Sequence, residues 1–208
     1  RSISHEFRTP LVKIGYRIAM LHESNQLSDH HNDTLRSYIN ELHALVDELL
    51  LYSSLEVTAQ PDMELFKLNP LLDNLKTELQ PLSDSTITLN CPNNYKVHGN
   101  EAYWRTILQN LLTNAQRYAN TNITICVTEQ HQQLVVTVTD DGDGINESNL
   151  DRIFEPFFVE EQSRNKKMAG HGLGLSIVKR MTQVQKGQIS VTNTNLGGAE
   201  FKLTFKLS

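Results

Sequence analysis

Two apolar stripes with a heptad repeat, close to the start of the chain, constrain its fold more than any other feature. One stripe consists of Phe7, Leu11, Ile14, Ile18 and Leu21, and the other of Leu35, Ile39, Leu42, Val46 and Leu49. Both follow the four-three spacing of a and d positions, which lines one side of a helix with apolar side chains. The polar stretch 24–33 interrupts the repeat, so residues 1–57 predict two antiparallel helices. Two helices bury such stripes poorly alone, and a four-helix bundle formed by a homodimer is the economical solution.

Residues 4–11 read SHEFRTPL and place a histidine on the first of these helices. In the heptad register His5 and Thr9 point away from the apolar stripe and share one face. Pro10 costs a helix interior about 3 kcal/mol and should bend it there. An isolated surface histidine usually has no function. Here, however, an exposed neutral imidazole is a competent nucleophile that Glu6 could orient.

Composition narrows the possible classes of protein. The chain has 208 residues and a formal net charge of -5, which argues against nucleic-acid binding through a basic face. Its two cysteines form no metal-binding spacing and fit a reducing compartment. No apolar run approaches the length of a membrane span. Because the first helical pattern begins without a cap, we expect the chain to be a fragment of a longer protein, so the lack of a membrane span here says little about that parent protein.

After a short linker at 58–61 the pattern changes, and residues 62–208 predict a single α/β sandwich. Helices are expected at 69–80, with Asn69 as N-cap and Pro70 at N1, at 100–119 with Asn100 as N-cap, and at 172–184. Strands are expected at 63–68, 86–90, 94–99, 122–130, 133–140, 188–193 and 199–207. The predicted fold class is therefore α+β, with a mixed sheet covered by helices on one face.

Two stretches of this second part carry polar groups suited to a ligand. Asn110 and Asn114 lie on one face of the long helix and precede Arg117 and Tyr118. Amide oxygens suit Mg²⁺, although an ordinary polar stripe is the simpler interpretation of the helix alone. In DDGDGI, Asp140 ends a strand and Gly142 and Gly144 follow it. That carboxylate could accept a hydrogen bond from a base amino group, or the stretch could be a simple turn; a calcium loop fits poorly.

Two further stretches follow along the chain. RIFEPFF at 152–158 places three aromatic rings around a proline, as part of the core or as a movable hinge beside a pocket. GHGLGLSIV at 170–178 alternates Gly170, Gly172 and Gly174 before a helix, and Leu173 lies within it. Backbone amides at such a helix start can bind phosphate. The polar segment before it carries Lys167, which could meet phosphate charge or lie in a solvated loop.

Each stretch alone is weak, but their order resembles the Bergerat-type ATP-binding domain shared by histidine kinases, Hsp90 and type II topoisomerases. SHEFRTPL resembles the phosphoacceptor box of histidine kinases. The chain as a whole is similar to the catalytic core of a bacterial two-component sensor histidine kinase, with a dimerisation and phosphotransfer hairpin at 1–57 and an ATP-binding domain at 62–208.

The resemblance implies a role for each matched residue. His5 would accept the γ-phosphoryl group of ATP, and Glu6 would polarise the His5 imidazole for this attack. Thr9 would position water for dephosphorylating the partner regulator. Asn114 would be the Mg²⁺ ligand. The remaining matched residues would bind the nucleotide: Asn110, Arg117, Tyr118, Asp140, Gly142, Gly144, Gly170, Gly172, Leu173, Gly174 and Lys167. No catalytic group of the family pattern is missing, so the resemblance implies an active enzyme.

The same resemblance implies ATP and Mg²⁺ as cofactors, and a homodimer that passes phosphate to an aspartate of a response regulator receiver domain. It also implies the cytoplasmic portion of a sensor anchored in the bacterial inner membrane. Two alternatives remain: a Bergerat-type ATPase clamp, which hydrolyses ATP without a phosphohistidine, and an inactive scaffold for dimerisation and regulator binding.

Overall fold

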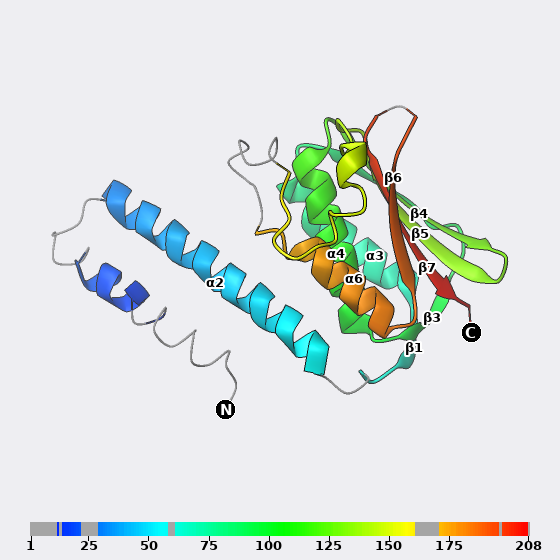
Figure 1. Cartoon of the computed structure of the whole chain (residues 1–208), viewed down its shortest axis with the longest axis horizontal. Coiled ribbons are helices and arrows are strands. Elements are labelled where there is room, and N and C mark those ends of the chain that lie inside the picture. The colour runs from blue at the N-terminus through cyan, green and yellow to red at the C-terminus, as the bar shows by residue number, and fades with distance from the viewer. Residues whose placement is uncertain are drawn as a thin grey trace. The chain divides into compact units, whose positions relative to one another are not determined.

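The computed structural model describes residues 12, 14–21, 29–57, 61–160, 171–195 and 197–207 (Figure 1). The chain divides into two compact units, residues 1–57 (unit 1) and 58–208 (unit 2). Each unit is described by itself. Across the described ranges, no helix combines the length and the apolar character that a membrane span requires.

Unit 1 is helical wherever it is described. Residues 12 and 14–21 are helical, and α2 runs from Asp29 to Val57. The apolar stripe predicted on α2 divides in two: Leu35, Ile39 and Val46 are half-buried, whereas Leu42 and Leu49 are 44% and 39% exposed. The two exposed leucines belong to a second four-three stripe that the periodicity analysis missed. This outer stripe consists of Tyr38, Leu42, Leu45, Leu49 and Tyr52.

Unit 2 contains seven strands among its described residues. They are β1 (Glu64–Lys67), β2 (Thr86–Asn90), β3 (Lys96–Gly99), β4 (Asn122–Gln130), β5 (Gln133–Asp140), β6 (Gln188–Asn193) and β7 (Ala199–Lys206). β1 and β3 form an antiparallel pair, and the other five form one sheet in the order β2-β4-β5-β7-β6. Only β2 and β4 are parallel, so the sheet is mixed, as predicted.

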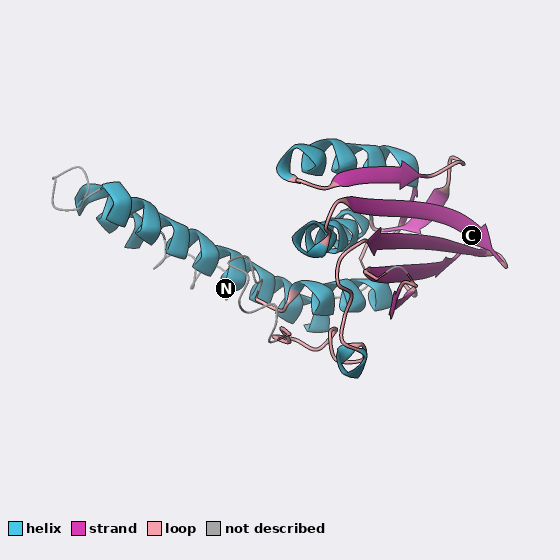
Figure 2. Ribbon diagram, turned by 90° about the horizontal axis from the view of Figure 1, so that it is seen from above, coloured by secondary structure: helices cyan, strands magenta, loops and turns pink. Residues whose placement is uncertain are grey.

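The core lies between this sheet and three helices. These are α3 (Leu68–Leu79), α4 (Glu101–Tyr118) and α6 (Gly174–Val184), and two short 3-10 turns lie at Gln80–Leu82 and Glu147–Asn149. Figure 2 shows the helices of this unit on one face of the sheet. In register on that face, Ile125 pairs with Val138 and Val138 with Phe201, and all three are buried. The α+β class with helices on one face of the sheet is thus confirmed.

The helix starts show one confirmed cap and one wrong one. Asn100 caps α4 as predicted, because its side-chain oxygen accepts from the Tyr103 amide at 3.0 Å. Asn69 does not cap α3, which begins at Leu68 directly after β1. The Asn69 amide nitrogen instead donates to the Cys91 carbonyl at 3.4 Å. The backbone amide of Leu68 bonds to the distant Tyr95 carbonyl, and the helix starts there, two residues before the predicted first helical position, Pro70.

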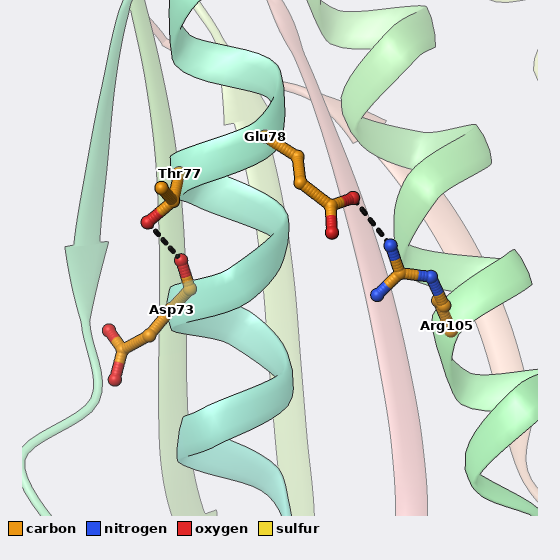
Figure 3. Close-up of polar contacts among 4 residues, drawn as sticks. All are labelled: Asp73, Thr77, Glu78 and Arg105. Atoms are coloured by element: carbon orange, nitrogen blue, oxygen red, sulfur yellow. Dashed lines mark hydrogen bonds and ion pairs between the residues drawn. The ribbon is translucent and has the colours of Figure 1, made fainter.

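Two polar contacts join α3 to α4. Figure 3 shows the ion pair between Glu78 of α3 and Arg105 of α4. Within α3 itself, the Thr77 hydroxyl donates to the Asp73 carbonyl at 2.8 Å. Further along, the Gln116 amide donates to the Leu79 carbonyl at 2.9 Å. The contacts made by Glu78 and Leu79 link α3 to α4, the helix that carries four of the predicted site residues.

Candidate active site

The predicted site residues fall into two groups. His5, Glu6, Thr9, Lys167 and Gly170 lie outside the residues that the structure describes. The other ten all belong to unit 2 and come from α4, from the end of β5 and from the start of α6. They are Asn110, Asn114, Arg117, Tyr118, Asp140, Gly142, Gly144, Gly172, Leu173 and Gly174.

The asparagine face of α4 contacts the start of α6. The Asn110 amide nitrogen donates to the Thr106 carbonyl at 2.8 Å, within its own helix. Its oxygen faces Gly174, where an added Cβ would lie 2.6 Å away. A side chain at position 174 would therefore displace the Asn110 side chain from its present place. Leu173, just before α6, is fully buried and anchors the helix start.

Asn114 lies one turn further along α4, on the same face as Asn110. Asn114 is half-buried, and its amide makes no side-chain hydrogen bond within the described part of the chain. The Asn110 oxygen, by contrast, is turned toward Gly174. Arg117 follows, half-buried, and among the described residues its Nε has no hydrogen-bond partner.

Asp140 is a buried carboxylate at the end of β5. Its residue is 5% exposed, and it pairs with Ile123 on the face of the sheet that carries the core. Its Oδ1 accepts from the amides of Gly142 at 3.0 Å and Ala199 at 3.2 Å. Loss of solvation on burial raises the pKa of Asp140, the two amide bonds oppose the rise, and the neighbouring charge of Asp141 adds to it. A buried carboxyl with a shifted pKa is a common feature of binding sites.

The turn after β5 meets the end of α4. A Cβ at Gly142 would lie 2.2 Å from the backbone oxygen of Tyr118, so only glycine fits there. This contact brings Tyr118 to the same strand end as Asp140. Gly144 lies in the same turn, against the side chain of Asn193. Gly172 accepts a hydrogen bond from the Phe157 amide at 2.9 Å and so joins the aromatic segment to the start of α6.

The aromatic segment 152–158 was predicted to belong to the core or to form a movable hinge beside a pocket, and its two halves differ. Ile153 is buried, and the Phe154 ring packs edge-on against Phe201 with centroids 6.4 Å apart. These residues belong to the core. Phe157 is 59% exposed and has a φ of 64°, a backbone conformation that is uncommon for a bulky residue. The structure therefore supports the core interpretation for one half of the segment only.

Sequence reasoning missed two residues that fix this site. Asp141 accepts hydrogen bonds from the turn that follows α4. Asn193, at the end of β6, donates to the Ile145 carbonyl at 2.7 Å and accepts from its amide at 2.8 Å. The doubled aspartate in DDGDGI was the available signal for Asp141. Nothing local marks Asn193, because its partner lies 48 residues away in sequence.

The oxygen atoms of this site suit a metal ion that takes most of its ligands from water and phosphate and few from the protein. Within the described residues, no group of three or more histidine, cysteine, aspartate or glutamate side chains could hold a metal ion. Mg²⁺ commonly binds through one or two protein oxygens together with water and phosphate oxygens. The Asn114 amide fits that pattern, whereas a zinc site built from protein ligands alone would not.

Comparisons with known proteins agree with this geometry. Residues 99–208 match the family model described as histidine kinase-, DNA gyrase B-, and HSP90-like ATPase. The chain is 34% identical over 211 residues to the sensor protein RstB of Escherichia coli K12, covering 99% of this chain and 47% of RstB. It is 29% identical over 204 residues to the sensor histidine kinase CpxA of the same strain, covering 94% of this chain and 44% of CpxA. It therefore spans about half the length of these relatives.

Among solved structures, the full-length protein ShkA in complex with AMPPNP matches with a TM-score of 0.74 at 26% sequence identity. The match covers 99% of this chain and 45% of ShkA. Both the helical unit and the sheet unit therefore have counterparts in another protein.

Proposed function

Since the chain belongs to the family of histidine kinase-, DNA gyrase B- and HSP90-like ATPases, we propose that it is the core of a two-component sensor histidine kinase. Unit 2 binds Mg-ATP, His5 accepts the γ-phosphoryl group, and an aspartate in a response regulator receiver domain then receives it. RstB and CpxA are both named as sensors, and CpxA as a histidine kinase. Because these relatives are about twice as long, we assign the chain to the cytoplasmic part of a membrane-bound sensor.

The observation that carries this proposal is the meeting of motifs that lie far apart in sequence. Asn110 contacts Gly174, and Tyr118 contacts Gly142 next to the buried Asp140. An acceptor for a base amino group, an amide oxygen for Mg²⁺ and a helix start for phosphate thus surround the C-terminal half of α4. A neutral polar stripe or a simple glycine turn would not require these contacts.

In the reaction, an imidazole nitrogen of His5 forms a bond to the γ-phosphorus while the bond to the β–γ bridging oxygen breaks. ADP leaves with that electron pair. Glu6 accepts a hydrogen bond from the N–H of the other ring nitrogen, and its negative charge stabilises the positive charge that develops on the ring. Mg²⁺ would neutralise phosphate charge during the transfer. Asp140 would orient the base, Asn114 would hold the metal, and the start of α6 would donate amides to the phosphates.

The reaction also needs a complete helical bundle, which we propose is a homodimer. Tyr38, Leu42 and Leu49 of the outer stripe are 61%, 44% and 39% exposed in the single chain. A continuous apolar stripe at heptad spacing is suited to pairing with a second copy of itself. Two copies of the hairpin would make the four-helix bundle predicted from the sequence.

The proposal is tested with γ-labelled ATP and Mg²⁺, followed by acid and alkali treatment of the labelled protein. We expect acid-labile, alkali-stable label that is absent from His5→Gln and present in His98→Gln, a control at an exposed histidine of β3. ATP turnover without any stable label would favour the clamp ATPase. Binding of an ATP analogue with neither label nor turnover would favour the scaffold.

A second activity follows from the same motif. The HExxT spacing of His5, Glu6 and Thr9 supports a role in removing phosphate from the regulator. We expect Thr9→Ala to retain autophosphorylation and to slow the loss of label from a receiver domain that has accepted it. Equal rates of loss in the two proteins would contradict this role.

A further inference from the structure

Asp141 makes an unusually complete set of hydrogen bonds for a side chain at the surface. Its Oδ1 accepts from three consecutive backbone amides, those of Asn120 at 2.9 Å, Thr121 at 2.9 Å and Asn122 at 3.0 Å. Its Oδ2 accepts from the Thr121 hydroxyl at 2.6 Å and from the Asn122 side chain at 3.3 Å. In return, the Asn120 side chain donates to the Asp141 carbonyl at 2.7 Å.

Three successive amides that point at one oxygen form an anion-binding nest. Here the nest is filled by a carboxylate of the same chain, 20 residues further along. The bonds from Thr121, Asn122 and Asn120 hold the pKa of Asp141 far below its ordinary value. The carboxylate is therefore charged at neutral pH, and it matches the amides of the nest in charge as well as in position.

This nest lies directly after α4, whose last residue is Tyr118. Asp141 therefore ties the end of α4 to the end of β5. On either side of it, Asp140 bonds to the Ala199 amide of β7, and Gly142 touches the Tyr118 carbonyl. Three consecutive residues thus join one strand end to β7, to the turn after α4 and to α4 itself.

We propose that Asp141 is a positioning residue for the nucleotide site, holding Tyr118 and the end of α4 at a fixed place relative to Asp140. The inference rests on the proposed function, because it assigns Tyr118 and Asp140 to the nucleotide base. Asp141 itself does not touch the nucleotide, since both of its carboxylate oxygens already accept hydrogen bonds from residues 120–122. Its effect on binding is therefore indirect.

Two variants of Asp141 separate this role from a general loss of stability. Asp141→Ala removes every side-chain bond to the turn, whereas Asp141→Asn keeps an oxygen that can still accept from the three amides. Asn100→Ala is the matched control. It removes the N-cap at the opposite end of the same helix, 18 residues or about 27 Å from Tyr118.

Two measurements are made on all four proteins. The first is amide hydrogen exchange without nucleotide. We expect faster exchange at 118–122 in Asp141→Ala and at the start of α4 in Asn100→Ala. The second is calorimetric binding of a non-hydrolysable ATP analogue with Mg²⁺. We expect about tenfold weaker binding for Asp141→Ala, most of that loss recovered in Asp141→Asn, and less than about twofold change for Asn100→Ala.

The outcomes separate the inference from the proposed function. Unchanged exchange at 118–122 in Asp141→Ala would overturn the inference, as would equal losses of affinity in Asp141→Ala and Asn100→Ala. Failure of the wild-type chain to bind the analogue would instead overturn the proposed function and, with it, the role of Asp141 in nucleotide binding. The exchange data would still decide whether Asp141 holds the end of α4.

Discussion

Units 1 and 2 differ in how far their apolar side chains are buried. In unit 2, residues such as Leu108 of α4 and Leu203 of β7 are completely buried between the sheet and the helices. Unit 1 contributes far fewer described residues, yet it holds eight of the eleven large apolar side chains that are exposed in the described part of the chain. Unit 2 closes its own core, whereas unit 1 presents a surface typical of an interface.

The difference follows from the elements themselves. A mostly antiparallel sheet with one polar face needs helices on its other face only, and α3, α4 and α6 supply them within unit 2. A two-helix hairpin has no third layer, and Tyr38, Leu42 and Leu49 of α2 are exposed in the single chain. For the proposed kinase, this means that nucleotide binding belongs to one chain, whereas the phosphoacceptor helix depends on two.

The largest expected effect is the loss of a core side chain from unit 2. Leu108→Ala removes a completely buried leucine from α4 and should cost about 2–5 kcal/mol of the free energy of unfolding. Trp104 is the only tryptophan in the chain and is buried on the same helix, so its fluorescence reports on unit 2 alone. The fluorescence midpoint in urea should fall by the same amount at low and at high protein concentration. A concentration-dependent midpoint would show that the core of unit 2 also needs a second chain.

The next effect concerns self-association of unit 1. Leu42→Glu places a charge on the outer stripe and removes about 1.5–3 kcal/mol of apolar burial from each copy, so the dimer should weaken at least 100-fold. Sedimentation equilibrium measures the change, and Asn40→Glu, at an exposed polar position of α2, is the control. The Trp104 midpoint should stay unchanged in both variants. Dimers of unaltered strength in Leu42→Glu would place the interface elsewhere.

The fold was predictable where signals are local. The alternating patterns at 122–130 and 133–140 predicted β4 and β5, and Asn100 was identified as a cap from its position before an amphipathic helix. The start of α3 was predicted wrongly, because the Leu68 amide finds its acceptor at Tyr95, 27 residues away. The outer stripe of α2 was missed because tyrosines occupy two of its five positions and a search for aliphatic heptads passes over them.

The candidate site was predictable as a set of motifs but not as a set of contacts. Asp140 and Gly142 were chosen from a resemblance, and their burial and close packing are consistent with that choice. Asp141 is adjacent to both, yet its partners at 120–122 belong to another element, and a sequence does not show which elements meet. Asn193 was missed for the same reason, since its hydrogen bonds to Ile145 form only because the end of β6 lies beside the turn after β5.

A smaller effect distinguishes stability from binding within unit 2. Burial raises the pKa of Asp140, so the folded chain binds this proton more readily than the unfolded chain. The contribution of Asp140 to stability is therefore present below its unfolded pKa of about 4 and lost as the pH rises through the folded value. Asp140→Asn keeps an acceptor for the Gly142 and Ala199 amides and does not titrate. It should be more stable than wild type at about pH 7, and it should not bind the ATP analogue.

The measurement is urea unfolding followed by Trp104 fluorescence at about pH 7 and about pH 4. The advantage of Asp140→Asn should shrink at the lower pH. The pH dependence of stability that comes from Asp141 has the opposite sign, because its pKa is lowered in the folded chain. Asp141 contributes stability above its unfolded pKa, and this contribution is lost as the pH falls through the folded pKa. A wild-type chain more stable than Asp140→Asn at neutral pH would mean that the buried carboxylate is compensated by a partner.

The smallest effect is expected at the ion pair between Arg105 and Glu78, which joins α3 to α4 (Figure 3). Both side chains are well exposed, at 39% and 52%, and pairs of this kind contribute little in water because solvent and salt screen them. Arg105→Ala and Glu78→Ala should each leave the Trp104 midpoint within experimental error, and the double variant should show no coupling. A clear loss in either single variant would mean that surface charge helps to close unit 2. In that case both the buried Leu108 and the exposed Arg105 of α4 would stabilise unit 2. The difference between the two units would then not rest on apolar burial alone.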